Sequence, residues 1–180
     1  MTTLEIESMT LPTSVLKNCI HETFVETGSY DGRTIQQALS AGFKYVHSIE
    51  LSFNYYRQCV DRFNGTMNVH LYHGDSEDIL PQIVRVLYKP ATFWLDAHIQ
   101  ENTVGLHPAP VLHELVAIRN SPIKNHTIMI DDIRLMGNSW WHDINLESVK
   151  GMISSINPMY TFERVDSKAA KNDILIARVK

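Results

Sequence analysis

The stretch "FVETGSYDG", residues 24–32, decides the fold that the sequence predicts. Its apolar run stops at an acidic residue, Glu26, and two glycines, Gly28 and Gly32, follow within the same stretch. Glycine adopts backbone conformations, and permits close approaches, that other residues do not. Apolar residues then recur at helical spacing over 33–41. The stretch therefore predicts a buried strand that ends in a carboxylate, a tight turn and a helix.

This strand–helix unit recurs five times, and the chain then ends differently. The predicted strands are 22–28, 44–51, 69–74, 91–97 and 126–132, and the helices that follow them are 33–41, 53–63, 77–88, 109–119 and 146–156. The last two strands, 159–166 and 173–180, are joined by a short polar turn with no room for a crossover helix, so they are antiparallel. The pattern predicts an α/β fold: a doubly wound, mostly parallel seven-stranded sheet with a C-terminal antiparallel hairpin.

Composition indicates one globular domain. The 180 residues are 44% hydrophobic and 20% charged, and we expect a single domain over 1–180 that begins with a short leader, 1–21. The net charge is -4 with acids and bases interspersed, which argues against nucleic acid as a partner. No apolar run approaches the roughly 20 residues that cross a bilayer. Cys19 and Cys59 form no close pair and no secretory signal is present, so a reducing, cytoplasmic location is expected.

Acidic residues close all five of the predicted parallel strands. They are Glu26, Glu50, Asp75, Asp96 and the adjacent pair Asp131 and Asp132. In an open parallel sheet, ligands bind outside the carboxyl ends of the strands, near the point where strand order reverses. Carboxylates crowded there repel one another unless cations or donor-rich ligands offset the repulsion. A helix cap is the simpler interpretation of Asp75 taken alone, but the whole set predicts a binding site.

The order of motifs resembles a known family across nearly the whole chain. "FVETGSYDG", "SIEL", "HGDS", "WLDAH" and "MIDD", with the closing hairpin, are similar to class I S-adenosylmethionine-dependent methyltransferases. E-T-G-x-x-x-G looks most like the macrocin O-methyltransferase group, which methylates sugar hydroxyls with the help of a divalent cation. The resemblance implies a Rossmann-like methyltransferase fold, S-adenosylmethionine as cofactor, and O-methylation of a sugar-like or diol-bearing small molecule.

A nicotinamide dinucleotide is the rival ligand. Its motif G-x-G-x-x-G, aligned on Gly28, requires glycines at positions 30 and 33 as well. This chain has Tyr30 and Arg33 there, so two of the three glycines are missing. An acidic residue about 20 positions further on is common to both families and does not discriminate. The missing glycines and the terminal hairpin favour the methyl donor over the dinucleotide.

The resemblance also assigns cofactor contacts. Glu26 would lie close to the methionyl part, and Glu50 suits a bidentate acceptor for two ribose hydroxyls. Asp75 and Ser76 would face the adenine, where Asp75 accepts from the exocyclic amine. Tyr30 stands where many relatives have glycine, so the turn must accept a side chain there. The full predicted set is Glu26, Thr27, Gly28, Ser29, Tyr30, Gly32, Glu50, Leu51, Gly74, Asp75, Ser76 and Asp96.

Asp96, Asp131 and Asp132 are the predicted metal ligands. Mg²⁺ takes oxygen ligands, often one or two carboxylates with water and substrate, and a cation there would lower the pKa of an acceptor hydroxyl. In the alternative, one aspartate of the pair caps a loop and the other pairs with Arg134. Successive strand residues point to opposite faces, so both are ligands only if the strand ends at Asp131.

The catalytic base and the acceptor site are less closely defined. Asp96 and His98 are both candidates for the general base, and the histidines lack the spacing of a zinc site. Trp140-Trp141-His142 is either an aromatic wall for the acceptor or packing. The site is covered by a lid over 99–108 or by a second subunit of a homodimer, or it is left open for a bulky acceptor. A non-catalytic binding domain of the same fold is the alternative function.

Overall fold

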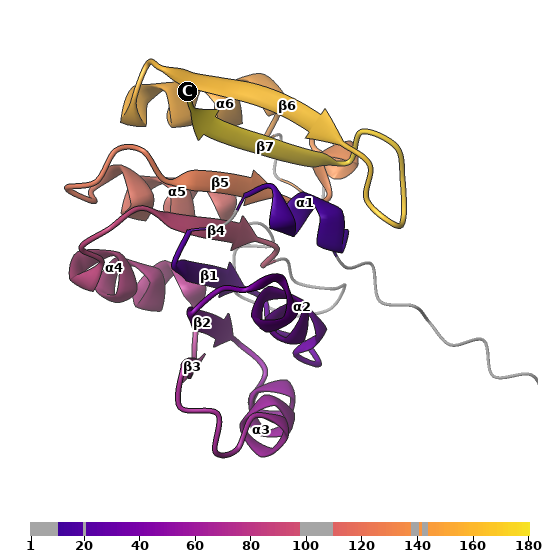
Figure 1. Cartoon of the computed structure of the whole chain (residues 1–180). Helices are drawn as coiled ribbons and strands as arrows, with labels where there is room; N and C mark the ends of the chain where they lie inside the picture. Colours follow the sequence, from indigo (N-terminus) through magenta and orange to yellow (C-terminus); the bar gives the residue numbers. More distant parts are fainter. Residues whose placement is uncertain (1–10, 20, 98–109, 138–140, 142–143) are drawn as a thin grey trace, which may run out of the picture.

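The computed structural model describes residues 11–19, 21–97, 110–137, 141 and 144–180, and within them one sheet carries the fold (Figure 1). Its strand order is β3-β2-β1-β4-β5-β7-β6. The strands are β1 Thr23–Thr27, β2 Tyr45–Glu50, β3 Val69–His73, β4 Ala91–Leu95, β5 Thr127–Ile130, β6 Tyr160–Val165 and β7 Ile174–Val179. The helices are α1 Thr13–Lys17, α2 Arg33–Ala41, α3 Phe53–Arg62, α4 Ser76–Val86, α5 Val111–Arg119, the 3-10 turn η1 Ile133–Leu135 and α6 Leu146–Ile156.

The predicted topology is confirmed. Strands β1 to β5 are parallel, whereas β7 lies between β5 and β6 and runs antiparallel to both. Because β7 runs in the opposite direction, it begins at the edge of the sheet where the parallel strands end. Ile130, the last residue of β5, pairs with Leu175 near the start of β7. The hairpin therefore brings residues from the end of the chain to the carboxyl edge of the sheet.

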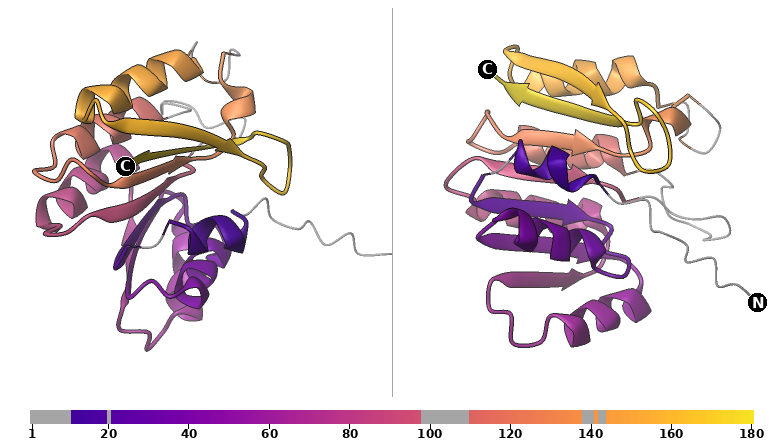
Figure 2. Two further views of the ribbon diagram at one scale, coloured as in Figure 1. Left: turned by 45° about the horizontal axis from the view of Figure 1, so that its top comes forward. Right: turned by 45° about the vertical axis from the view of Figure 1, so that its right-hand side comes forward.

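Helices cover both faces of the sheet (Figure 2). Alternate strand residues point to opposite faces, so Phe24 packs with the side chains of α1, α2 and α3, and Val25 packs with those of α4, α5 and α6. Phe93 and Trp94 divide in the same way on β4, and all four side chains are fully buried. None of the helices that the structure describes is long and apolar enough to cross a membrane.

Gly28 and Gly32 are required by the packing of the chain itself. Both have positive φ, 85° and 76°. A Cβ on Gly28 would lie 2.7 Å from the backbone oxygen of Asp96, and one on Gly32 would lie 2.7 Å from Cε2 of Phe63. Both glycines are among the predicted cofactor contacts. For Gly32, the neighbours that exclude a side chain belong to α3 and the residue that follows it.

We expect Gly28→Ala to destabilise the fold far more than Gly65→Ala. Gly65 has φ 79° but nothing lies near the position of its missing Cβ, so alanine there carries only the left-handed backbone cost of about 1 to 2 kcal/mol. At Gly28 the clash with backbone adds to that cost, for a total of about 3 kcal/mol or more. Urea unfolding of the two variants measures the difference, and equal losses would contradict the packing argument.

Candidate functional site

The candidate site lies where the strand order reverses, between β1 and β4. The acids predicted at the strand ends meet at this edge, as their effects on one another show. Burial raises the pKa of Glu26 to about 8, and the negative charges of Asp96 and Glu50 contribute. Asp96 follows β4 directly, and its backbone N–H donates to the backbone oxygen of Thr27 at the end of β1 (3.2 Å). The parallel arrangement has therefore gathered carboxylates from separate strands.

Glu26 is a fully buried acid at the base of the first turn. Its Oε2 accepts a hydrogen bond from Oγ of Ser48 on β2 (2.5 Å), and Ser48 Oγ lies 2.5 Å from Oγ of Ser29. The acid is thus linked through Ser48 to Ser29 in the turn that follows β1. With a pKa of about 8, which burial raises, Glu26 carries a proton at neutral pH.

Glu50 holds the same turn from β2. One carboxylate oxygen accepts from the backbone N–H of Tyr30 (2.8 Å) and the other from that of Ser52 (2.7 Å). A carboxylate oxygen has a second lone pair, so each can accept one more donor. Tyr30 has φ 47°, a conformation typical of glycine, and its ring, 50% exposed, packs 4.4 Å from the ring of Tyr55. The turn therefore accepts the tyrosine that the sequence left to be explained.

Asp75, which follows β3, caps the N-terminus of α4, and this is the role that the sequence analysis gave as the simpler alternative to ligand binding. Its Oδ1 accepts from the backbone N–H of Glu77 (2.9 Å) at the start of α4. Ser76 next to it is buried. Gly74 N–H donates to the backbone oxygen of Glu50 (2.9 Å), which ties this end of β3 to β2, and Leu51 is exposed at the same edge. The cap uses one oxygen of Asp75 and leaves the other for a ligand.

Glu114 is an acid that sequence reasoning missed. It lies on α5 with both carboxylate oxygens buried, and within the described part of the chain neither makes a hydrogen bond of normal geometry. Burial raises the pKa of Glu114 to about 7, although the nearby hydroxyls of Ser76 and Thr27 favour the ionised form. The available indication was a glutamate within the mostly apolar run "VLHELVAI", whose other polar residue is His113.

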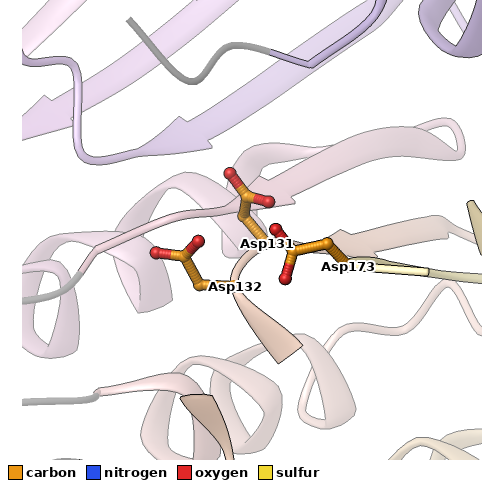
Figure 3. Close-up of side chains that lie close together, drawn as sticks. All are labelled: Asp131, Asp132 and Asp173. Carbon is orange, nitrogen blue, oxygen red and sulfur yellow. The ribbon is translucent and has the colours of Figure 1, made fainter. Parts of the chain in front are cut away.

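Asp131 and Asp132 lie together with a third aspartate, Asp173 (Figure 3). β5 ends at Ile130, so both residues of the pair have left the strand, and Asp132 adopts φ 55°. Oxygen atoms of the three carboxylates lie within 4.8 Å of one another, and all three residues are buried. Asp173 precedes β7, and sequence reasoning missed it because the position of the hairpin beside β5 was not known.

Asp131 is the member of this cluster that most needs a positive partner. It is 3% exposed, and its Oδ1 has no hydrogen-bond partner among the described residues. Burial raises the pKa of Asp131 to about 8, and the charges of Asp96 and Asp132 raise it further. The charge of Asp96, the third predicted ligand, therefore acts on Asp131. The group whose carboxylate oxygens lie within 4.8 Å of one another, however, contains Asp173 and not Asp96.

Arg134 bears out the alternative interpretation for one aspartate of the pair. Its Nη1 forms ion pairs with Asp132 and with Asp173. Among the residues that the structure describes, Asp96, Asp131, Asp132 and Asp173 thus bring four carboxylates to this part of the edge, and Arg134 pairs with two of them. Oxygen ligands with excess negative charge and one unpartnered buried oxygen fit a hard divalent cation such as Mg²⁺.

Several predicted residues lie outside the described part of the chain. They are His98, the expected lid 99–108, Trp140 and His142. Trp141 is described and is 6% exposed within the core cluster of α4, α5 and α6. Of the two interpretations of Trp141, an aromatic wall for the acceptor or packing, this burial supports packing.

Solved structures decide the fold family. The O-methyltransferase TomG from Streptomyces achromogenes, in complex with S-adenosylmethionine, is similar with a TM-score of 0.66 and 14% identity, over 97% of this chain and 83% of TomG. The chain has the class I methyltransferase fold. The O-methyltransferase from Bacillus cereus in complex with S-adenosylhomocysteine shares this methyltransferase fold, with a TM-score of 0.65 and 15% identity, over 96% of this chain and 84% of that one.

A third similar structure is that of the methyltransferase PaMTH1 from Podospora anserina, bound to S-adenosylhomocysteine. Its TM-score is 0.63 at 13% identity, over 93% of this chain and 76% of PaMTH1. No model of a protein family matches the chain, and no curated protein sequence matches it. The likeness is thus one of methyltransferase fold, at a sequence identity of 13 to 15%.

The proton on Glu26 predicts how stability depends on pH. A glutamate in the unfolded chain ionises near pH 4.5, whereas burial raises the pKa of folded Glu26 to about 8. Between these values the folded state binds one more proton, so the free energy of unfolding falls as pH rises, by at most about 1.4 kcal/mol per pH unit. Glu26→Gln is neutral throughout, and we expect it to lose less stability than the unmodified protein between about pH 5.5 and about pH 8.

Urea unfolding at the two pH values measures this effect, and Glu22→Gln is the matched control. Hydrogen bonds from Lys44 and Lys89 lower the pKa of the exposed Glu22 to about 2, so its contribution is lost only in acid, below the chosen window. If the free energy of unfolding of Glu26→Gln fell with pH as steeply as that of Glu22→Gln and of the unmodified protein, Glu26 would not be protonated in the folded state at neutral pH.

Proposed function

We propose that the protein is an S-adenosylmethionine-dependent methyltransferase that acts on a hydroxyl oxygen. The observation that carries this proposal is the set of buried acids at the switch point of a methyltransferase fold, above all Glu26 and Glu50. It is supported by two O-methyltransferases of the same fold, one in complex with S-adenosylmethionine and the other with S-adenosylhomocysteine. A scaffold without a ligand would have no use for acids whose crowding opposes folding.

The residues of the first turn would bind and orient the cofactor. S-adenosylmethionine, when bound, supplies an electrophilic methyl group on a positively charged sulfur. Glu26 and Ser29 would lie near its methionyl end, and Glu50 would accept from the ribose hydroxyls with the lone pairs that Tyr30 and Ser52 leave unused. Asp75 has one oxygen beyond its helix cap for the adenine amine. Because methyl transfer is an in-line displacement, this alignment supplies much of the rate.

A divalent cation, Mg²⁺, is the second part of the proposal. Asp131 would be its main ligand, with Asp96 and Asp132 beside it, since the unpartnered Oδ1 of Asp131 and the excess negative charge both call for a cation. When bound, the cation supplies Lewis acidity that lowers the pKa of an acceptor hydroxyl. Asp96 or His98 would take the released proton. Because a hard divalent cation takes oxygen ligands, this part of the proposal fits a sugar-like or diol-bearing small molecule as the acceptor.

Calorimetric titration with S-adenosylmethionine, S-adenosylhomocysteine and NAD tests the cofactor. We expect the first two to bind and NAD not to. Glu50→Gln should weaken S-adenosylhomocysteine binding by about 1 to 3 kcal/mol, because one charged acceptor is lost, while the exposed Asp61→Asn should not change it. Glutamine keeps an acceptor for the turn, which alanine would not. Binding of NAD alone would indicate an oxidoreductase, and no binding at all would favour a non-catalytic domain.

Asp131→Asn tests the cation separately from the cofactor. We expect the variant to lose Mg²⁺ binding and metal-dependent methyl transfer, since the amide offers no charge, while its affinity for S-adenosylhomocysteine changes little. Calorimetry with each ligand in turn gives both results, with Asp61→Asn again as control. Methyl transfer that proceeds equally with and without a chelator would remove the cation from the mechanism.

A further inference from the structure

Asp173 is built into the hairpin as an anchor. Its Oδ1 accepts from the backbone N–H of Arg134 (3.3 Å), and its Oδ2 accepts from Oγ of Ser167 (2.7 Å) and from the guanidinium of Arg134. Its backbone oxygen also accepts from the N–H of Ile133 (3.0 Å). With both oxygens in use and the side chain fully buried, Asp173 differs from Asp131, which keeps an unpartnered oxygen. Asp173 therefore serves to hold Arg134.

Arg134 bridges the anchor to a predicted metal ligand. The same nitrogen, Nη1, that pairs with Asp173 also pairs with Oδ1 of Asp132. A guanidinium does not lose its proton in proteins, so this positive charge is present at every working pH. A divalent cation beside Asp132 would be repelled by the guanidinium and would have to share the carboxylate with it. Asp131, by contrast, forms no ion pair with Arg134, and its Oδ1 has no hydrogen-bond partner among the described residues.

We infer that Arg134, anchored by Asp173, is a positioning residue that competes with a divalent cation for Asp132 and thereby sets the cation affinity of the site. This inference rests on the proposed metal-assisted function, since it concerns the same carboxylates. In the absence of a cation, Arg134 neutralises Asp132 and stabilises the turn after β5. A bound cation would be held chiefly by Asp131. Asp132 would contribute to its binding only when the ion pair between Asp132 and Arg134 is broken.

Calorimetric titration of the full-length protein with MnCl₂, in low salt without cofactor, tests the inference. We expect Arg134→Gln to bind Mn²⁺ at least about tenfold more tightly, because a competing charge is removed. Arg134→Lys keeps the charge and should return the affinity to within a few fold of the unmodified protein. Arg178→Gln is the matched control: Arg178 pairs with Glu163 (2.6 Å) on the hairpin, away from the acids, and its loss should leave the affinity unchanged.

A double-mutant cycle with Asp132→Asn shows whether Arg134 acts through Asp132. If it does, Arg134→Gln should increase Mn²⁺ affinity much less in the Asp132→Asn background than in the unmodified protein. An equal increase in both backgrounds, or no increase in either, would overturn the inference. Should Arg134→Gln fail to fold, Arg134→Met gives the same test, because it removes the positive charge while keeping a long side chain in the same place.

Titration of the same samples with S-adenosylhomocysteine separates this inference from the proposed function. Intact S-adenosylhomocysteine binding with unchanged Mn²⁺ affinity in Arg134→Gln would overturn the role of Arg134 alone. Loss of S-adenosylhomocysteine binding in the unmodified protein would overturn the proposed cofactor, while the Mn²⁺ titrations would still decide the role of Arg134. Absence of Mn²⁺ binding in every variant would overturn the inference.

Discussion

Repulsion between carboxylates at one edge of the sheet is the constraint on which the rest of this structure depends. Five parallel strands end there, and each brings an acid with it. Three different features of the structure reduce this repulsion. Burial raises the pKa values of Glu26 and Asp131 to about 8, so that both hold protons at neutral pH. Backbone N–H groups donate hydrogen bonds to Glu50 and Asp75, and Arg134 forms ion pairs with both Asp132 and Asp173, which offsets part of their negative charge.

These three solutions divide the edge into regions with different chemistry. The acids solvated by backbone hold the first turn and the start of α4, and they can accept further donors without a change in their charge. The acids that carry protons would ionise when a positive ligand approaches, so ligand binding and proton release are linked there. Asp96 links the two acids that carry protons, because its charge raises the pKa values of both Glu26 and Asp131.

The C-terminal hairpin has a part in the site as well as in the sheet. By running antiparallel between β5 and β6, β7 starts at the acidic edge and places Asp173 beside Asp131 and Asp132. A parallel seventh strand would have begun at the opposite edge and left Arg134 without its anchor. The feature that distinguishes this sheet from one with only parallel strands therefore also determines how the acids after β5 are neutralised.

Local pattern in the sequence was enough to determine the strands, the helices and the acids that close each strand. Alternation, helical spacing and the turn at Gly28 act over a few residues, and parallel strands necessarily end at one edge, so Glu26, Glu50, Asp96 and Asp131 could be grouped in advance. Glu114, Asp173 and the burial of Trp141 depend on which helix face or hairpin end packs where, and local pattern does not contain that information. The purpose of Gly32 was likewise decided by Phe63, a residue distant in sequence that only tertiary packing brings within 2.7 Å of the missing Cβ.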